Sequence, residues 1–407
     1  MKTPLSIYRG LPSSIYVLFA SQVINSAGSF VYPFLTLYLT QRLGYSALQA
    51  GMALTFSALL YVPGSLVGSK LADTIGRKPV MVTFQILMDL TYIACGFVEG
   101  TKFLLPMVLL AHLFDGAVDP AREALKSDVT TMENRQNSFS FLYLGHNVGY
   151  AIGPFVAGYL FLLAPSWLFW GNGIAGLIAT TFVIFKIPES KPSDEVLEAS
   201  KAWKSTEKGE EGGILKALRA RPQVLLFTLF LSISWYAYSQ MYFALPLVTT
   251  SLFGSSGSKL YGNLMGFNGL LVVLFNPIFV HRLKSNHPLT NCGFANLLFM
   301  ITFIGFSWVT RSPFFFLLAI GYTFAEIIQA TNDHYWIANN TPITHRGRFN
   351  AIIPMIVGSG NAIAPTIGGA IITNYGFGVL WIITAAAAFI AAAGIFTLRL
   401  QEKEQAL

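Results

Sequence analysis

The sequence predicts an all-α membrane protein: 12 transmembrane helices in two six-helix bundles related by a pseudo-twofold repeat. Three observations lead to this fold class. The composition is too apolar for an ordinary soluble domain, twelve apolar runs are long enough to cross a bilayer, and a ten-residue pattern occurs twice in the chain.

The composition places the chain in a bilayer. Of its 407 residues, 54% are hydrophobic and only 11% are charged, with a mean hydropathy of +0.56, whereas soluble domains carry about 25% charged residues. A spanning helix needs about 20 mostly apolar residues. The runs that meet this length lie at residues 15–39, 46–69, 79–98, 103–126, 137–162, 166–187, 223–247, 260–280, 289–309, 313–335, 349–373 and 377–398.

The basic residues predict the orientation. All of the 26 Lys and Arg except Arg42, Lys102, Lys259 and Arg311 lie on one side if the helices alternate in direction. Positive charge accumulates in cytoplasmic loops, so we expect both termini in the cytoplasm, in the cell (inner or plasma) membrane. The formal net charge of +7 then needs no nucleic-acid partner.

The repeated pattern divides the chain into halves. The sequence reads GYAIGPFVAG at 149–158 and GNAIAPTIGG at 360–369, 211 positions later, in the fifth apolar run of each half. A polar, charged stretch separates the halves. The predicted domains are an N-terminal six-helix bundle at 1–187, a cytoplasmic central loop at 188–222 and a C-terminal six-helix bundle at 223–407.

The loop between the second and third runs carries a recognisable motif. SKLADTIGRKPVM, at 69–81, resembles the loop signature G-x-L-a-D-r-x-G-r-k of the major facilitator superfamily, and twelve helices in two repeats are similar to that family's fold. In the family this loop is a charge-linked latch at the cytoplasmic face, whereas positive-inside anchoring alone would account for its cations. The resemblance implies a latch made by Asp73, Gly76, Arg77, Lys78 and Asp128.

The first copy of the repeat resembles the antiporter signature G-x-x-x-G-P-x-x-G-G of the family's fifth helix. The matching positions are Gly149, Gly153, Pro154 and Gly158, with Ala157 in place of one glycine. The resemblance implies the drug:proton antiporter (multidrug efflux) branch. The alternative is that these residues serve close helix packing and a tolerated kink.

Four ionisable residues are candidates for proton coupling. Asp89, Asp115 and Glu326 fall near the middle of their apolar runs, and His112 precedes Asp115 by one helical turn, where the two side chains could exchange a hydrogen bond or proton. Such groups are costly at membrane depth and usually mark an ion or substrate path. The resemblance implies that helices 4 and 10 line the cavity and helix 3 does not, so a structural hydrogen bond is an alternative for Asp89. His112 and Asp115 stand where the family usually has the Arg and Gln of R-x-x-Q-G, which is a departure from its pattern.

The substrate cavity is predicted from aromatic and amide side chains. Aromatic faces suit planar or cationic lipophiles, and packing against lipid or a neighbouring helix is the alternative for each residue. No Lys or Arg falls near the middle of a run, which argues against an anionic substrate. The candidates are Gln22, Asn25, Trp235, Tyr238, Tyr242, Phe243 and Asn268.

The predicted function is proton-coupled antiport, by alternating access, of hydrophobic or cationic drug-like small molecules. The alternatives are proton-linked transport of a sugar or other small polar metabolite, and a non-transporting lipid-handling or sensor protein on the same fold. No phosphate-binding loop GxxxxGK[ST] and no metal-ligand spacing is evident. We therefore expect no enzyme activity, cofactor or metal. The expected partners are the substrate, protons and the lipid bilayer, and the expected state is a monomer.

Overall fold

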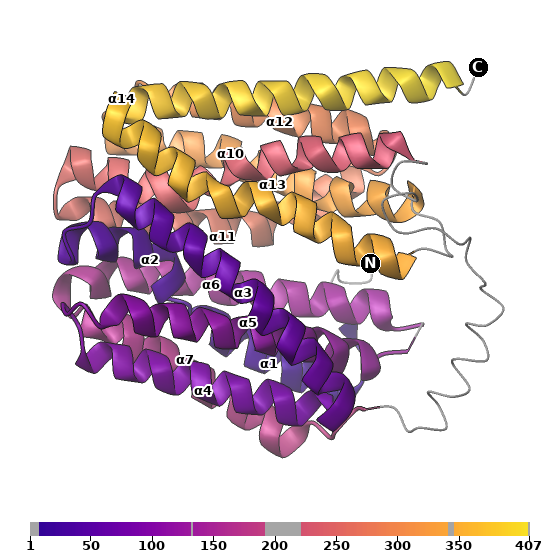
Figure 1. Ribbon diagram of the computed structural model, residues 1–407. Helices are drawn as coiled ribbons and strands as arrows, with labels where there is room; N and C mark the ends of the chain where they lie inside the picture. The colour runs from indigo at the N-terminus through magenta and orange to yellow at the C-terminus, as the bar shows by residue number, and fades with distance from the viewer. Residues whose placement is uncertain (1–7, 132, 192–220, 341–345, 406–407) are drawn as a thin grey trace. The chain divides into compact units, whose positions relative to one another are not determined.

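The computed structural model describes residues 8–131, 133–191, 221–340 and 346–405 (Figure 1). Their regular structure is helical, and each of the twelve predicted apolar runs overlaps at least one helix. The helices are α1 (Ser13–Ala27), α2 (Val31–Leu37), a π-helix (Tyr38–Arg42), α3 (Ala47–Ile75), α4 (Arg77–Phe97), α5 (Leu104–Asp128), α6 (Arg135–Leu163), α7 (Ser166–Lys186), α10 (Pro222–Phe253), α11 (Ser256–Leu283), α12 (Pro288–Phe306), α13 (Ser312–Asn340) and α14 (Arg346–Gln405).

Ten spans in these residues are long and apolar enough to cross a membrane. One of them, Ile353–Lys403, contains most of the eleventh predicted run and all of the twelfth, because α14 is two helices joined at a kink. Gly376 at the kink has φ +82°, a conformation that L side chains rarely adopt. The fifth run lies on α6, a 29-residue helix outside those ten spans.

The first predicted run, 15–39, is not one continuous helix. It breaks after α1 at Gly28 and resumes as α2 and the π-helix. A break at membrane depth exposes backbone N–H groups that need partners, and the Asn172 Oδ1 accepts from the N–H of Phe30 (3.1 Å) and of Val31 (3.3 Å).

The chain forms two compact units. The first comprises residues 1–45, 53–194 and 249–273. In it α4 packs against α5 and α7, and α1 packs against α6 and α7. A buried apolar cluster joins these helices, with Ile15, Val80, Val118 and Val183 among its members.

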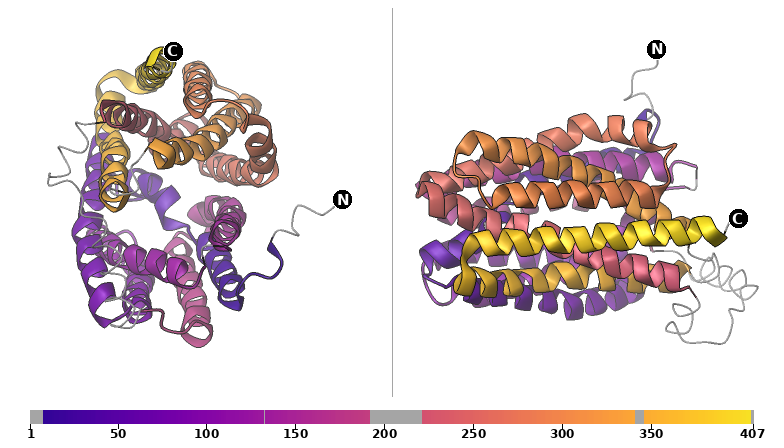
Figure 2. Two further views of the ribbon diagram at one scale, coloured as in Figure 1. Left: turned by 90° about the vertical axis from the view of Figure 1, so that its right-hand side faces the viewer. Right: turned by 90° about the horizontal axis from the view of Figure 1, so that it is seen from above.

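The second unit comprises residues 46–52, 195–248 and 274–407. In it α12 packs against both α13 and α14, and the long C-terminal arm of α14 is the yellow helix in Figure 2. Phe227, Leu289, Trp336 and Ile395 belong to its buried cluster. The boundaries of these units differ from the predicted 1–187 and 223–407, and most of the predicted central loop, 192–220, lies outside the described residues.

Candidate functional site

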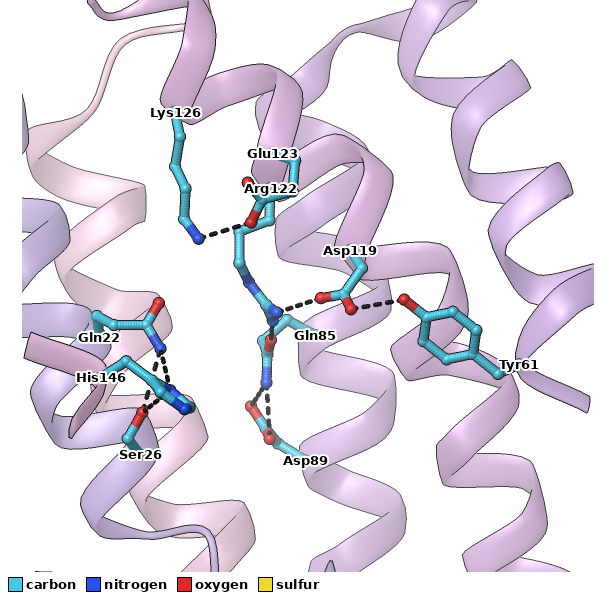
Figure 3. Close-up of polar contacts among 10 residues, drawn as sticks. All are labelled: Gln22, Ser26, Tyr61, Gln85, Asp89, Asp119, Arg122, Glu123, Lys126 and His146. Atoms are coloured by element: carbon cyan, nitrogen blue, oxygen red, sulfur yellow. Dashed lines mark hydrogen bonds and ion pairs between the residues drawn. The ribbon is translucent and has the colours of Figure 1, made fainter. Parts of the chain in front are cut away.

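A continuous chain of polar contacts links three helices of the first unit (Figure 3). The Tyr61 hydroxyl on α3 donates to Asp119 Oδ2 on α5 at 2.6 Å. Arg122 donates to the other oxygen of Asp119 and, at 2.8 Å, to Gln85 Oε1 on α4. Gln85 Nε2 in turn lies 3.1 and 3.2 Å from the two carboxylate oxygens of Asp89. This series of polar contacts therefore connects a partly exposed acid, Asp119, to a fully buried one, Asp89.

Asp89 is sealed inside the unit. Its side chain is 0% exposed, and a β-carbon on Gly176 of α7 would collide with its carboxylate. Burial of an acid is tolerated only when it is hydrogen-bonded or protonated. Asp89 thus belongs to the same polar chain as Asp119 and Arg122, a connection that sequence position alone does not reveal.

The two candidates on α5 have different surroundings. Asp115 is partly buried, one helical turn before Asp119, and lies within electrostatic range of both Asp119 and Arg122. His112 Nδ1 lies 3.0 Å from the Val108 carbonyl oxygen on its own helix. His112 thus contacts the backbone of its own helix through Nδ1, whereas the sequence suggested a hydrogen bond to Asp115.

A second polar cluster joins α1 to α6. The Ser26 hydroxyl lies 3.0 Å from His146 Nδ1, and Gln22 Nε2 lies 3.1 Å from Ser26 Oγ and 3.5 Å from the same imidazole nitrogen. Gln22 was predicted as a cavity residue, but His146 was not. The feature of the sequence that could have identified His146 is that it is a single histidine inside the apolar fifth run.

Gln22 and Asn25 line a small cavity of about 20 Å³ in the first unit, which is room for one water molecule. Arg122 and Lys126 belong to the same lining. Two cations placed near the end of the fourth run therefore line a cavity together with two of the predicted cavity residues.

In the second unit three of the predicted aromatic residues, Trp235, Tyr238 and Tyr242, gather beside Glu326 of α13. The Tyr238 hydroxyl donates to Glu326 Oε1 at 2.8 Å and lies 3.1 Å from the Tyr242 hydroxyl. The rings of Trp235 and Tyr322 are 4.9 and 5.8 Å from that of Tyr238, centroid to centroid. A carboxyl group beside several aromatic rings is an arrangement that can hold an organic cation.

Phe243 and Asn268 are the two predicted cavity residues that remain. Phe243 is 1% exposed and packs beside Gly368, while Asn268 is 3% exposed in α11 and belongs to the first unit.

The predicted latch residues come together at the α3–α4 turn. Arg77 Nη2 lies 3.3 Å from Asp73, its Nε lies 3.3 Å from Asp128, and Lys78 Nζ donates to the Ile184 carbonyl oxygen at 2.7 Å. Gly76 supplies the turn with φ +119°, a conformation that favours glycine.

Sequence reasoning missed one member of the latch. The Glu189 carboxylate accepts from the backbone N–H of Arg77 (3.0 Å) and of Lys78 (3.1 Å). These are the first N–H groups of α4, which lack partners within the helix, and a carboxylate there is favoured by the helix dipole. Glu189 follows α7, so only the fold brings it to α4.

The antiporter-like glycines all lie at close helix contacts. A β-carbon on Gly153 would lie 2.7 Å from the Ser26 carbonyl oxygen on α1, and one on Gly158 would lie 3.0 Å from that of Ser258 on α11. Gly149 is pressed against Val23 of α1 in the same way. Close packing therefore accounts for the three glycines of the first copy.

Comparison with known proteins adds independent findings. A family model described as Major Facilitator Superfamily matches residues 18–332. The chain is 25% identical to the uncharacterized MFS-type transporter YttB of Bacillus subtilis, over 91% of each chain. It is also 25% identical to a Na⁺, Li⁺, K⁺/H⁺ antiporter of Planococcus maritimus, over 88% of this chain and 89% of the relative.

A more distant match is the multidrug resistance protein MdtH of Yersinia enterocolitica, 22% identical over 59% of this chain and 57% of that protein. Among solved structures, a POT family transporter in complex with a thioalcohol-conjugated peptide superposes with a TM-score of 0.78 over 97% of each chain, at 15% identity. At that identity the likeness concerns the fold.

Proposed function

The chain belongs to the Major Facilitator Superfamily, and on that premise we propose that it exports hydrophobic or cationic compounds in exchange for protons by alternating access. Its relatives are membrane transporters of small molecules and not enzymes. The proposal extends to two six-helix halves, 1–187 and 223–407, to a monomer with both termini in the cytoplasm, and to the cell membrane.

One observation carries the proton part of the proposal. Asp119 contacts the guanidinium of Arg122, Asp89 is linked to it through Gln85, and Asp115 lies within electrostatic range of it. Three ionised carboxylates beside one cation would leave excess negative charge in a medium of low dielectric constant, which is costly. A proton at Asp89 or Asp115 relieves that cost, so the cluster is suited to bind and release protons.

The substrate part rests on Glu326 and its aromatic neighbours. A cation that reaches this carboxyl group gains both charge pairing and the faces of Tyr238 and Trp235. A proton neutralises the same carboxyl group, so substrate and proton can exclude each other, as exchange requires. The names of two relatives, a monovalent cation/H⁺ antiporter and a multidrug resistance protein, support the same direction.

A second candidate function is proton-linked transport of a small polar metabolite bearing an anionic group. The observation that favours it is the pair of cations, Arg122 and Lys126, in the cavity lined by Gln22 and Asn25. The cavity as described has room for one water molecule, so a carboxylate would bind only where the site widens, and there it would meet two cationic donors and two amides.

The test uses purified protein in proteoliposomes with an imposed pH gradient. A fluorescent lipophilic cation reports transport by wild type, Asp115→Asn and Glu326→Gln. We expect gradient-driven movement in wild type and its loss in either variant. The matched control is Glu123→Gln, on the same helix as Asp115, whose carboxylate contacts Lys126 and is more exposed.

Movement that does not depend on the gradient would overturn the proposal. Gradient-driven movement of an aromatic carboxylate in place of the cation would favour the second candidate. Equal activity in all three variants would show that the coupling acids lie elsewhere.

A further inference from the structure

Gln85 occupies an unusual position between a guanidinium and a buried acid. Its side chain is 3% exposed, its Oε1 accepts from Arg122 Nη2 at 2.8 Å, and its Nε2 faces both oxygens of Asp89. Neither the loop motif nor the antiporter motif includes this residue.

The chemistry of the two partners fixes the direction of the amide. Arginine has donors only, so the Gln85 oxygen has to face Arg122. The amide nitrogen is then left to face Asp89, and an N–H group can only donate. Arg122 thereby presents Asp89 with a donor, and it does so through Gln85 without contacting the acid.

Arg122 consequently interacts with two acids at the same time. It contacts Asp119 directly and Asp89 through the amide. Asp119 is the accessible end, with its side chain 37% exposed, and Asp89 is the sealed end at 0%. Other titratable groups near this pair are Asp115 on α5, Tyr92 on α4 and Tyr61 on α3. Those near Arg122 are Glu123 and Lys126 on α5 and His146 on α6.

The second unit provides an internal comparison. Asn296 stands 211 positions after Gln85, and its Nδ2 also bridges to the neighbouring helix, donating to Gln329 Oε1 at 2.7 Å. Gln329 in turn donates to the Ser234 hydroxyl at 2.7 Å. The position 211 after Asp89 is Met300, so the same bridge is built there from neutral groups.

We propose that Gln85 is a positioning residue that couples the protonation of Asp89 to the charge of the side chain at position 119 through Arg122. One positive charge offsets one negative charge, so a neutral side chain at position 119 favours ionised Asp89, and the carboxylate of Asp119 favours a proton on Asp89. The amide carries this coupling by orientation and polarisation, and no proton passes through it. Its role in transport rests on the proposed function, whereas the coupling itself requires neither substrate nor gradient.

The test is a double-mutant cycle read by infrared spectroscopy on purified protein without substrate. The carboxyl band that disappears in Asp89→Asn is assigned to Asp89 and followed as a function of pH. We expect Asp119→Asn to move the midpoint of that band to lower pH by about one unit. In a Gln85→Met background, which keeps side-chain length but removes the amide, the same substitution should move it by less than half as much.

The control is Asn296→Leu, which breaks the neutral bridge of the second unit and should leave the cycle unchanged. If Gln85→Met does not fold, Gln85→Leu takes its place in the cycle. An equal shift in both backgrounds, or no Asp89 band that changes with pH, overturns the coupling. A reduced shift together with absent proton-driven flux supports the coupling and removes only the proposed function.

Discussion

Gly262 of α11 lies so close to Pro154 of α6 that a β-carbon on the glycine would stand 2.7 Å from the proline carbonyl oxygen. Gly51 of α3 meets Pro365 of α14 in the same way, within the second unit. Both members of the second pair are offset by 211 positions from their counterparts in the first. The repeated sequence pattern is therefore a repeated helix contact, made once in each unit.

These contacts predict that Gly262→Ala and Gly51→Ala destabilise the protein. An added methyl group has to displace backbone, which costs about 1–3 kcal/mol in a packed interior. Thermal unfolding in detergent measures the effect. Gly358→Ala is the matched control, because a β-carbon there meets nothing within 4 Å, and alanine favours helix over glycine. Equal melting temperatures for all three variants would contradict the packing interpretation.

The Glu189 cap predicts a graded loss of stability. Glu189→Ala leaves the N–H groups of Arg77 and Lys78 without their carboxylate acceptor, and the loss of such a cap costs about 1 kcal/mol. Glu189→Gln keeps one acceptor oxygen, so its stability should lie between that of the alanine variant and that of wild type. The melting temperatures of the three proteins test this order. A glutamine variant less stable than the alanine variant would contradict it.

The sequence predicted contacts that lie close together in the chain or belong to a repeated pattern. Asp73 and Arg77 lie four positions apart in one loop motif, on either side of the turn at Gly76, so the motif itself brings them together. Glu189 was missed because its contact with α4 depends on where α7 ends. Gln85 was missed because a neutral amide in an apolar run is not distinctive until Arg122 is seen beside it.

The break in the first predicted helix has the same kind of cause. Residues 15–39 are apolar enough to span as one helix, and nothing local requires a break at Gly28. The partner that satisfies the freed N–H groups, Asn172, comes from α7, more than a hundred positions later in the chain. Hydropathy finds the span but not the tertiary contact.

His287 predicts a pH dependence of stability. Burial lowers the pKa of His287 below its ordinary value, and Arg399 lowers it further, against the opposing effect of Glu402. Its Nδ1 also accepts from the Leu289 N–H at 3.3 Å, a bond that the protonated ring cannot accept.

The native state therefore binds this proton less tightly than the unfolded state, so stability falls as the pH drops below about 6.5. His287→Asn keeps an acceptor at the helix start but does not titrate. The stability of this variant should therefore fall less at low pH than that of wild type. Thermal unfolding of both proteins between about pH 5 and pH 8 measures it. Identical profiles would exclude His287 as a cause.

The contact between Tyr238 and Glu326 predicts how one hydroxyl affects substrate affinity. Tyr238→Phe keeps the aromatic ring but removes the hydrogen bond to the carboxyl group, and a bond to a charged partner contributes about 1.5–3 kcal/mol. We expect the affinity for a lipophilic cation to fall by about tenfold or more, because the carboxyl group that pairs with the cation is no longer held in place. Tyr236→Phe, on the same helix, removes a buried hydroxyl that has no hydrogen-bond partner in the described residues, so it should bind the cation as wild type does. Equal affinities in the two variants would mean that the Tyr238 hydroxyl does not position Glu326 for the substrate.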